Sequence, residues 1–550
     1  MAKYTKNDLI FLPLGGSGEI GMNVNLYHFK GQWIMCDLGA GFADDRHPGV
    51  DLVVANINFV KSLGEHFLGL VCTHAHEDHI GGIPYLWDQL ECPIYATPFT
   101  ASMVRSKLHE TGLERKAKVT EVQPGSQFEL GPFNLELVQI THSIPEMNGI
   151  IIKTELGTVL HTGDWKLDPE PVIGPTTDEA RLKQCGDEGV LAMICDSTNI
   201  FREGTSGSES GLMAGLSGLI AEAGKGLVVV ATFASNVARL DTIARAAEAN
   251  GRKVVLAGRS LWRVYAAARE NGYLTDLEPF LDDRQAVKVP RHKQLVISTG
   301  CQGEEQAATA KLAYGKHPGL RLNKGDTVIF SSKVIPGNEK KIIHLLNEFV
   351  KQRVEVYTEK DHFVHVSGHP CRDEVRRMYE LVRPQIAVPV HGEAMHLHEH
   401  TKFAKSLGVP QTVEVQNGAM VRLAPGNAEI IQHIENGIWM IDGQRLVDPE
   451  SKVMKARRRM QRSGAAFVTV VLTKRGKLVT EPQILVPGLL DYDENRALLW
   501  ELSEELADVV DSQRQTSEDA IVRATRRFLR KALKQETGKE PLIEVHVVVC

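Results

Sequence analysis

The sequence predicts an α/β protein with several domains, because the chain is long and its pattern of strands and helices changes along its length. At 550 residues, it exceeds what one hydrophobic core supports, so two to four domains are expected. Residues 9–200 predict short strands with turns and a few helices. From about residue 210 to 360, strands alternate with amphipathic helices, which is typical of a parallel sheet.

The first region predicts two strand-helix pairs followed by further strands. These elements are expected at residues 66–74, 80–90, 92–98, 99–112, 133–143 and 151–165. The middle region repeats a strand-helix unit at 226–258, 294–315 and 326–358, with Ser235 as an N-cap candidate and Gly251 as a helix terminator. We therefore expect an inserted parallel-sheet domain at residues 209–371.

The flanking segments 1–208 and 372–449 are expected to form one domain around this insertion. A polar, basic segment at 450–464 predicts a linker. Residues 465–550 predict a small α+β domain, with a hairpin around KRGK (474–477), helices near 492–513 and 517–535, and a closing apolar strand.

Composition excludes several classes of protein. The longest apolar runs have the length of strands, far below a membrane span, and the N-terminus lacks the apolar stretch of a secretory signal. Eight cysteines are scattered without a CxxC pair, which favours buried thiols in a reducing compartment. We expect a cytoplasmic protein with no membrane partner. The net charge of −6 argues against indiscriminate nucleic-acid binding, although 455–462 and 523–534 are locally basic.

The segment THAHEDHIGG (73–82) predicts a metal site at the end of a strand. It supplies His74, His76, Asp78 and His79 within six positions. A catalytic zinc needs three protein ligands and a structural zinc four, and so compact a loop cannot easily turn all four side chains to one ion. Further donors end other apolar strands, namely His142, Asp164 and His391. The seven together are enough for a site with two metal ions.

These motifs resemble the metallo-β-lactamase superfamily, within it the β-CASP nucleic-acid-processing branch, and most closely the ribonuclease J family. The resemblance extends over roughly residues 8–450, and the matching segments follow the family order: LGGSGEIGMN (14–23), CDLGAGF (36–42), THAHEDHIGG, HSIPE (142–146), TGDWKLD (162–168), DSTN (196–199), TFASNVAR (232–239), HVSGH (365–369) and PVHGE (389–393). The family usually has HSIPD, so Glu146 departs conservatively. The implied fold is a metallo-β-lactamase αββα sandwich with an inserted β-CASP domain and a small C-terminal α+β domain.

The resemblance also implies roles for individual residues. His74, His76 and His142 would hold one zinc, Asp78, His79 and His391 the other, and Asp164 would bridge them; Asp37 would orient ligands from behind. His369, paired with Asp196, would protonate the leaving 3′ oxygen. Ser235, Asn236, His365, Ser367 and the Gly368 turn would bind a phosphate. Asp196, His369 and Asp78 are thus the expected catalytic residues.

The predicted insertion decides which substrate the metals act on. Two divalent ions activate water and stabilise charge on a phosphodiester, but superfamily relatives also hydrolyse small molecules. The loops TFASN (232–236), STGCQGE (298–304) and FSSKVIPGNE (330–339) follow predicted parallel strands, where open α/β sheets bind ligands. Ordinary helix capping explains each loop equally well. In this branch, a histidine at His391 accompanies RNA processing, whereas DNA-processing relatives often have valine.

The expected protein is therefore a zinc-dependent ribonuclease with two Zn²⁺ per subunit, and with Mn²⁺ or Mg²⁺ as alternative ions supporting activity. By resemblance it combines 5′→3′ exonuclease activity on 5′-monophosphorylated RNA with endonuclease activity, in mRNA decay and rRNA maturation. Its partners would be single-stranded RNA and further copies of itself, as a homodimer or homotetramer formed through the C-terminal domain. The basic helix face at 523–534 is open to RNA binding or to such an interface.

The sequence also bears on alternative functions and contains two further motifs with metal- or nucleotide-site spacing. A DNA-processing nuclease and a catalytically weak RNA-binding subunit are the rivals; His391 argues against the first, and the complete ligand set against the second. A small-molecule hydrolase would not need the long insertion. The GxGxxG segment 16–21 precedes a strand-like segment, which favours a β-turn over a dinucleotide site. His396 and His400 have helical ligand spacing, but we expect a polar helix surface there.

Overall fold

The computed structural model describes residues 4–44, 46–335, 337–513 and 517–550. The chain forms two compact units, Met1–Gly41 with Val54–Gly437, and Phe42–Val53 with Ile438–Cys550. Each is described by itself. No helix in the described ranges is long and apolar enough to cross a membrane.

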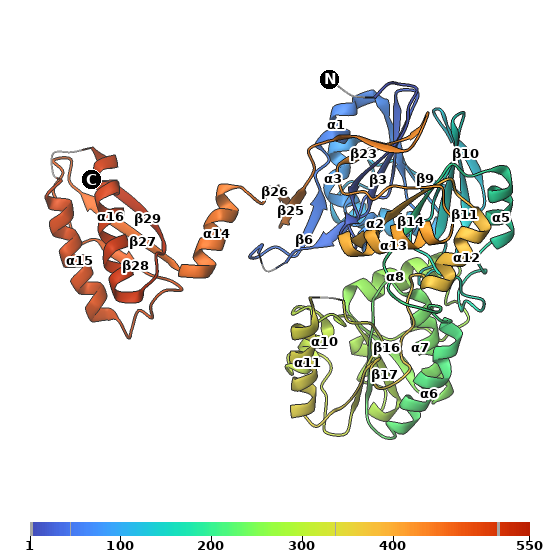
Figure 1. Ribbon diagram of the computed structural model, residues 1–550. Helices are drawn as coiled ribbons and strands as arrows, with labels where there is room; N and C mark the ends of the chain where they lie inside the picture. The colour runs from blue at the N-terminus through green and yellow to red at the C-terminus, as the bar shows by residue number, and fades with distance from the viewer. Residues whose placement is uncertain (1–3, 45, 336, 514–516) are drawn as a thin grey trace. The chain divides into compact units, whose positions relative to one another are not determined.

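Two mixed β-sheets form the centre of the first unit (Figure 1). The eight-stranded sheet has the order β24 (Glu429–His433), β23 (Ala419–Ala424), β1 (Leu9–Gly15), β3 (Val24–Phe29), β4 (Gln32–Cys36), β7 (Phe67–Val71), β8 (Ile94–Ala96), β9 (Val119–Glu121). The seven-stranded sheet has the order β10 (Gln127–Leu130), β11 (Phe133–Gln139), β12 (Asn148–Thr154), β13 (Gly157–His161), β14 (Ala192–Asp196), β20 (Ile386–Val390), β22 (Gln411–Thr412).

An apolar core joins side chains of both sheets, among them Phe11, Tyr27, Leu135, Ile150 and Val388. A second core joins the seven-stranded sheet to α5 (Glu179–Glu188), α12 (Arg372–Val382) and α13 (Ala394–Ser406). On the eight-stranded sheet, α1 (Asn58–Leu63) packs Phe59 on Trp33 of β4, and α4 (Pro98–Glu110) contacts α3 (Ile83–Leu90), β8 and β9. The predicted αββα sandwich is confirmed.

The insertion is a five-stranded parallel sheet between β14 and β20. Its order is β16 (Lys253–Ala257), β17 (Gln294–Ser298), β15 (Val228–Ala231), β18 (Thr327–Phe330), β19 (Glu355–Tyr357), with all neighbours parallel. Its helices are α6 (Leu212–Glu222), α7 (Val237–Ala249), α8 (Arg259–Glu270), α9 (Asp283–Ala286), α10 (Ala308–Ala313) and α11 (Glu339–Lys351). The inner positions of these strands are mostly apolar because both faces of such a sheet are covered, while β16 and β19 begin with the exposed Lys253 and Glu355.

The second unit takes in the segment between β5 (Ala40–Phe42) and β6 (Leu52–Ala55), and resumes with β25 (Ile438–Asp442) and β26 (Arg445–Val447). Its three-stranded sheet has the order β28 (Gln483–Leu485), β27 (Ala465–Leu472), β29 (Leu542–Val549). Helices α15 (Arg496–Asp511) and α16 (Glu518–Thr537) share one core with it. The closing strand pairs in parallel with β27, a pairing the sequence pattern had not specified.

A helix occupies the segment expected to be a linker. Helix α14 (Lys452–Ser463) begins at Ser451, whose side chain accepts a hydrogen bond from Met454 N at 3.3 Å, and ends at Gly464, where φ is 69°. Both signals, an N-cap serine and a glycine after the last turn, were present in the sequence. The high polarity of the segment had concealed them.

Candidate metal centre and active site

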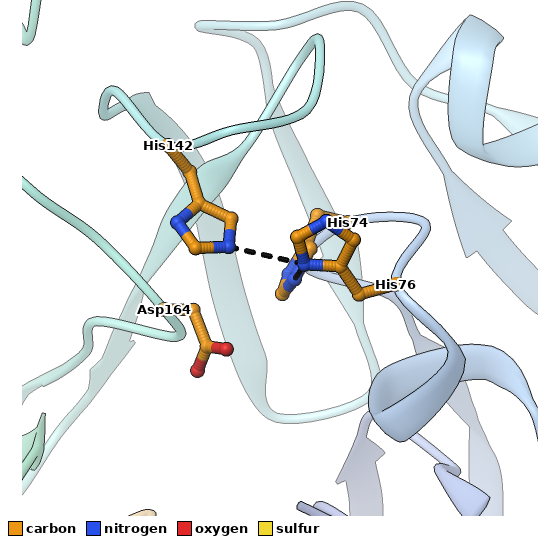
Figure 2. A group of neighbouring side chains, drawn as sticks. All are labelled: His74, His76, His142 and Asp164. Atoms are coloured by element: carbon orange, nitrogen blue, oxygen red, sulfur yellow. Dashed lines mark hydrogen bonds between the residues drawn. The ribbon is translucent and has the colours of Figure 1, made fainter. Parts of the chain in front are cut away.

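The seven predicted ligand side chains converge at one edge of the two sheets of the sandwich. The loop after β7 continues into α2 (Glu77–Ile80) and presents four of them, while His142, Asp164 and His391 follow β11, β13 and β20. Ligand atoms of His74, His76, His142 and Asp164 lie within 4.8 Å of one another. Figure 2 shows these four side chains. A second group of the same compactness contains Asp78, His79, Asp164 and His391. Asp164 belongs to both groups.

Three of the four donors in the first group are neutral imidazole nitrogens, from His74, His76 and His142. His76 Nδ1 lies 3.0 Å from His74 Nε2 and 3.0 Å from His142 Nε2. Burial, together with the neighbouring histidines, lowers the pKa of His74 and His142 well below the ordinary value, and it lowers the pKa of His76 to about 4. These imidazoles therefore keep their lone pairs available at neutral pH, as metal binding requires.

The second group combines histidines with ionised carboxylates. His79 Nε2 lies 3.1 Å from Asp164 Oδ2, and His391 Nε2 lies 3.2 Å from Asp78 Oδ2. Burial would raise the pKa of the Asp78 and Asp164 carboxyls, but the surrounding histidines hold both well below their usual range. Burial alone would lower the pKa of His79 and His391. The neighbouring carboxylates, Asp164 foremost, have the larger effect and raise the pKa of both imidazoles well above the ordinary value.

The donor set fits divalent cations. Among the described residues, the ion pairs of Asp78, Asp164 and Asp196 are all with histidines and none is with lysine or arginine. Buried carboxylates left without a cation are costly, and nitrogen and oxygen donors in this arrangement are what zinc takes.

Asp37 orients the ligand His79 by contacting the ring nitrogen that faces away from the site. Its Oδ2 atom accepts from Thr73 Oγ1 at 2.7 Å and lies 2.7 Å from His79 Nδ1, which fixes the ring so that Nε2 faces the site. Asp37 and His391 have φ values of 65° and 53°, in the left-handed region that side chains rarely adopt. The backbone holds them there through hydrogen bonds from Asp37 N to Val71 O at 3.0 Å and from His391 N to Gly16 O at 2.6 Å.

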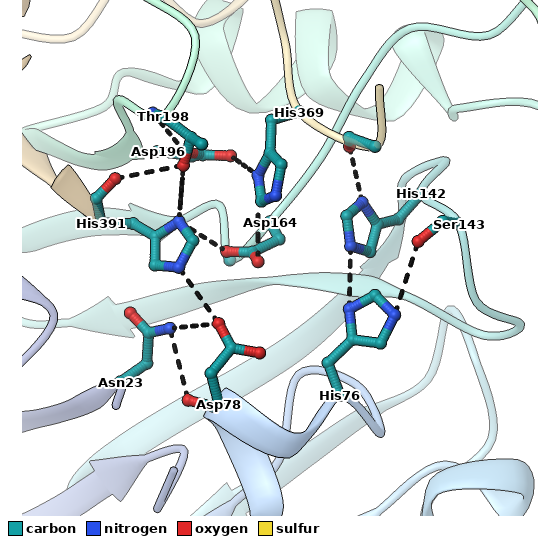
Figure 3. Close-up of polar contacts among 12 residues, drawn as sticks. Asn23, His76, Asp78, His142, Ser143, Asp164, Asp196, Thr198, His369 and His391 are labelled. Atoms are coloured by element: carbon teal, nitrogen blue, oxygen red, sulfur yellow. Dashed lines mark hydrogen bonds and ion pairs between the residues drawn. The ribbon is translucent and has the colours of Figure 1, made fainter. Parts of the chain in front are cut away.

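The predicted proton-transfer pair lies beside the second group (Figure 3). His369 Nδ1 is 2.8 Å from Asp196 Oδ2 and 3.9 Å from Asp164 Oδ2. Burial alone would lower the pKa of His369, but these two carboxylates raise it above the ordinary value. A protonated imidazole is thereby favoured at a point where the ligand groups and Asp196 meet.

The expected phosphate-binding residues lie on both sides of the insertion boundary, and several are already engaged. The Asn236 side chain caps α7 by accepting from Arg239 N at 2.8 Å. Ser367 Oγ accepts from Asn199 Nδ2 at 2.8 Å, and Gly368 O lies 2.6 Å from His142 Nδ1. A side chain at Gly368 would collide with His142, which requires glycine there. Ser235 is half-buried, and its hydroxyl makes no bond recorded among the described residues.

The remaining phosphate-binding candidate, His365, lies among cations. Burial and the charges of Arg239, Lys333, Arg202 and Lys166 lower the pKa of its imidazole well below the ordinary value. His365 is therefore a neutral group in a positive environment. The loop 330–339 that contributes Lys333 includes Pro336, which lies outside the described residues.

Buried Arg239 fixes the segment that carries His365. Its guanidinium pairs with Glu209 at 2.5 Å and donates to Ser331 Oγ at 2.8 Å, and it is fully buried. Arg239→Ala is expected to lower the free energy of unfolding by about 3–5 kcal/mol, because it leaves Glu209 buried and unpaired. Chemical denaturation of the full chain measures this loss.

The surface arginine Arg377, half-exposed and paired with Glu179, is the control. Arg377→Ala is expected to cost about 0–1 kcal/mol. Equal losses in the two variants would contradict the role given to Arg239, as would failure of the double change Arg239→Met with Glu209→Leu to recover stability.

Several site residues were not singled out from the sequence. Thr198 Oγ1 donates to Asp196 Oδ1 at 2.7 Å and lies 2.8 Å from His391 Nδ1, so it links the two. Asn23 Nδ2 lies 3.0 Å from His79 Nε2, and Asn199 reaches both Ser367 and the backbone of His369. All three residues stand in motifs quoted above, LGGSGEIGMN and DSTN, which is the signal that could have found them.

Glu146, the departure from HSIPD, joins the sandwich to the insertion. Its carboxylate accepts from Phe99 N at 2.8 Å and from the hydroxyl of Tyr273, in the insertion, at 3.2 Å. A neighbouring contact pairs Arg263 of α8 with Glu110 of α4.

The two motifs that were not expected to bind a ligand, GxGxxG and the histidines of α13, support the fold around the site. The short strand β2 (Ser17–Gly18) of the GxGxxG segment pairs in parallel with β21 (Gly392–Glu393), so it is more than a turn and it supports the backbone beside His391. His400 is wrongly expected on a polar surface. It is buried, with Ser197 Oγ and Tyr379 OH at 2.9 and 3.0 Å, because α13 packs this face on the sheet.

Comparisons with known proteins agree with this architecture. The model of the beta-lactamase superfamily domain matches residues 42–182, and that of the ribonuclease J beta-CASP domain matches 225–349. Residues 353–414 match the Zn-dependent metallo-hydrolase RNA specificity domain, and 452–549 the ribonuclease J C-terminal domain.

Relatives that match this chain over nearly its full length are named ribonuclease J. Ribonuclease J of Sinorhizobium meliloti is 43% identical over 548 residues, which cover 98% of this chain and 97% of that protein. Ribonuclease J of Thermus thermophilus is 33% identical over 547 residues, covering 97% and 94%. A solved structure of a protein of unknown function from Enterococcus faecalis has a TM-score of 0.51 at 16% identity, covers 75% of this chain and 99% of its own, and shows the fold alone. The chain belongs to the ribonuclease J family of the metallo-β-lactamase superfamily.

Proposed function

We propose that this protein is a zinc-dependent ribonuclease that degrades RNA from a 5′-monophosphorylated end in the 5′→3′ direction and also cleaves internally. The observation that carries the proposal is the placement of the Asp196–His369 pair at the junction of two donor groups that share Asp164. The match to an RNA specificity domain and the name of the full-length relatives favour RNA over DNA and small molecules. Its roles would be mRNA decay and rRNA maturation.

His74, His76 and His142 with Asp164 would hold one ion, and Asp78, His79 and His391 with Asp164 the other. We assign two Zn²⁺ per subunit, with Mn²⁺ or Mg²⁺ able to support activity. When bound, two such ions supply a nucleophilic water at neutral pH and stabilise the charge on the phosphate under attack. Asp78 has a catalytic role because it completes the second group, and Asp37 holds His79 in the orientation this requires.

The side chains of the chain itself would position the RNA and move a proton. His369, whose pKa the carboxylate of Asp196 raises, donates a proton to the leaving 3′ oxygen, so the products carry a 5′-phosphate. Ser235, Asn236, His365, Ser367 and the Gly368 turn would bind the 5′-monophosphate, with neutral His365 as a hydrogen-bonding group and the nearby cations supplying charge.

The test compares RNA of one sequence carrying a 5′-monophosphate or a 5′-triphosphate, labelled at its 3′ end. We expect degradation of the monophosphate to be faster by about tenfold or more, equivalent to about 1.4 kcal/mol or more, because a site that binds one terminal phosphate would not accommodate the added bulk and charge of a triphosphate. Ser367→Ala should reduce this preference. Equal degradation rates for the monophosphate and triphosphate RNAs would contradict the 5′-end proposal. A wild-type protein that degrades neither RNA would contradict the ribonuclease assignment.

The remaining expectations complete the proposal. Residues 1–208 and 372–449 would be the metallo-β-lactamase domain, 209–371 the β-CASP domain, 450–464 a connecting segment and 465–550 the C-terminal domain. We propose a homodimer or homotetramer formed through the C-terminal domain, acting on single-stranded RNA in the cytoplasm.

A further inference from the structure

An aromatic pair formed by one exposed and one half-buried ring lies next to the candidate active site and has no part in the function proposed so far. Phe201 is 47% exposed, although it stands five residues after Asp196. Its ring meets the ring of His396 edge to face, with centroids 5.2 Å apart and planes at 70°. We call Phe201 and His396 the aromatic platform.

The platform is tied to the catalytic centre on both sides. His396 lies in the first turn of α13, and the helix follows the short strand β21 after His391. A side-chain carbon at Gly392 would come within 2.8 Å of His396 Cβ and 3.3 Å of Ser197 Cβ. The glycine next to His391 therefore lets the His396 ring approach the motif that carries Asp196.

The turn carrying Phe201 is held rigidly. Arg372 N donates to Arg202 O at 2.9 Å, and Arg372 Nε donates to Ile200 O at 2.8 Å. The backbone that carries the ring is thus fixed before any ligand arrives, which reduces the entropy lost on binding.

Two cations border the platform on the side of His365. Arg202 is exposed and Lys333 is half-buried, and neither forms an ion pair with any residue in the described part of the chain. Burial and the nearby charge of Arg202 lower the pKa of Lys333, and both cations act on His365 as well. The carboxylate of Glu359 partly opposes this effect on Lys333 but forms no ion pair with it among the described residues, so two positive charges that repel each other remain as a place for an anion.

His396 also offers an unused polar atom. Its Nδ1 is buried and has no hydrogen-bond partner in the described structure. An aromatic face, a free ring nitrogen and adjacent cations match the parts of one nucleotide, because bases stack on aromatic rings while cations hold the backbone.

We propose that the aromatic platform stacks one unpaired base of single-stranded RNA, and that Arg202 and Lys333 hold the neighbouring phosphate. The proposal rests on the ribonuclease function above and adds a binding subsite to it. Stacking of this kind accepts every base, so the subsite would select for unpaired RNA and not for a particular sequence.

The experiment measures kcat and KM of the metal-loaded protein on 5′-monophosphorylated single-stranded RNA. Phe201→Ala should raise KM about tenfold, equivalent to about 1.4 kcal/mol, with a much smaller change in kcat. Phe201→Trp should restore KM, because it restores the stacking surface. Tyr314→Ala, which removes an aromatic of 49% exposure at the end of α10, should leave KM unchanged.

Substrates with one abasic nucleotide at successive positions identify the stacked base. At one position, the abasic change should raise KM for the wild type about as much as Phe201→Ala does, and should add nothing in that variant. Arg202→Ala should lower the salt dependence of binding by about one ion.

Three results would overturn the proposal: an unchanged KM in Phe201→Ala, additive effects of Phe201→Ala and the abasic change at every position, or an equal loss on bis(4-nitrophenyl) phosphate, which has no base. A wild type that binds RNA without cleaving it would instead overturn the ribonuclease function. The two failures are therefore distinguishable.

Discussion

Asp78→Ala is expected to lower the rate of RNA cleavage by about 10³-fold or more, which corresponds to about 4 kcal/mol of lost transition-state stabilisation. Asp78 supplies the carboxylate nearest to His391 Nε2, at 3.2 Å, and its oxygen also lies 3.5 Å from His79 Nε2. Removing it leaves the second donor group with two histidines and the shared Asp164. Single-turnover cleavage of labelled RNA measures the effect.

Metal content provides an independent readout for this variant. Elemental analysis should find about one ion fewer per chain in Asp78→Ala than in the wild type. Glu77→Ala is the matched control, because Glu77 is the preceding acid but points to Lys107. Full activity of Asp78→Ala, or two tightly bound ions in it, would contradict the two-metal assignment.

His369→Ala is expected to reduce kcat by about 10²–10⁴-fold, the usual contribution of a positioned general acid, with little effect on metal content. Asp196→Asn should produce a loss in the same direction, because the amide no longer raises the pKa of His369 through its charge. Steady-state kinetics on monophosphorylated RNA measures both variants.

A chemical rescue separates proton donation from simple damage. In RNA with sulfur in place of the bridging 3′ oxygen, the leaving thiolate needs no proton, so His369→Ala should regain most of its lost rate. His398→Ala, which removes an exposed histidine paired with Glu414, is the control. The same deficit on both substrates would contradict the role of His369 as an acid.

Hydrophobic patterning predicted the strands of the first region and the parallel insertion because it is local and strong in both, whereas the αββα arrangement was implied by the motifs that resemble the metallo-β-lactamase superfamily. It also predicted which side chains would meet, since His142, Asp164 and His391 each end an apolar strand and strand ends converge at one edge of a sheet. The central strand of the insertion, Val228–Ala231, is buried and apolar at every position, as expected of a sheet that is covered on both faces.

Contacts between distant segments lay beyond sequence reasoning. No pattern specifies that β2 will pair with β21, that Glu146 will reach Tyr273, or that Arg239 will pair with Glu209. Such contacts form only when whole elements dock against each other. In the sequence alone, the same residues are equally consistent with exposed polar side chains. His400 is a further example. Its polar sequence neighbours led to the expectation of an exposed side chain, but His400 is buried.

The order of the ligands along the chain has a consequence for synthesis on the ribosome. Asp164 and His391 are separated by 391 − 164 = 227 residues, and the insertion lies between them. At roughly 5–20 residues per second, that interval takes about 11–45 s. During this time the emerging protein lacks its last metal ligand, so it would remain inert toward the messenger being translated.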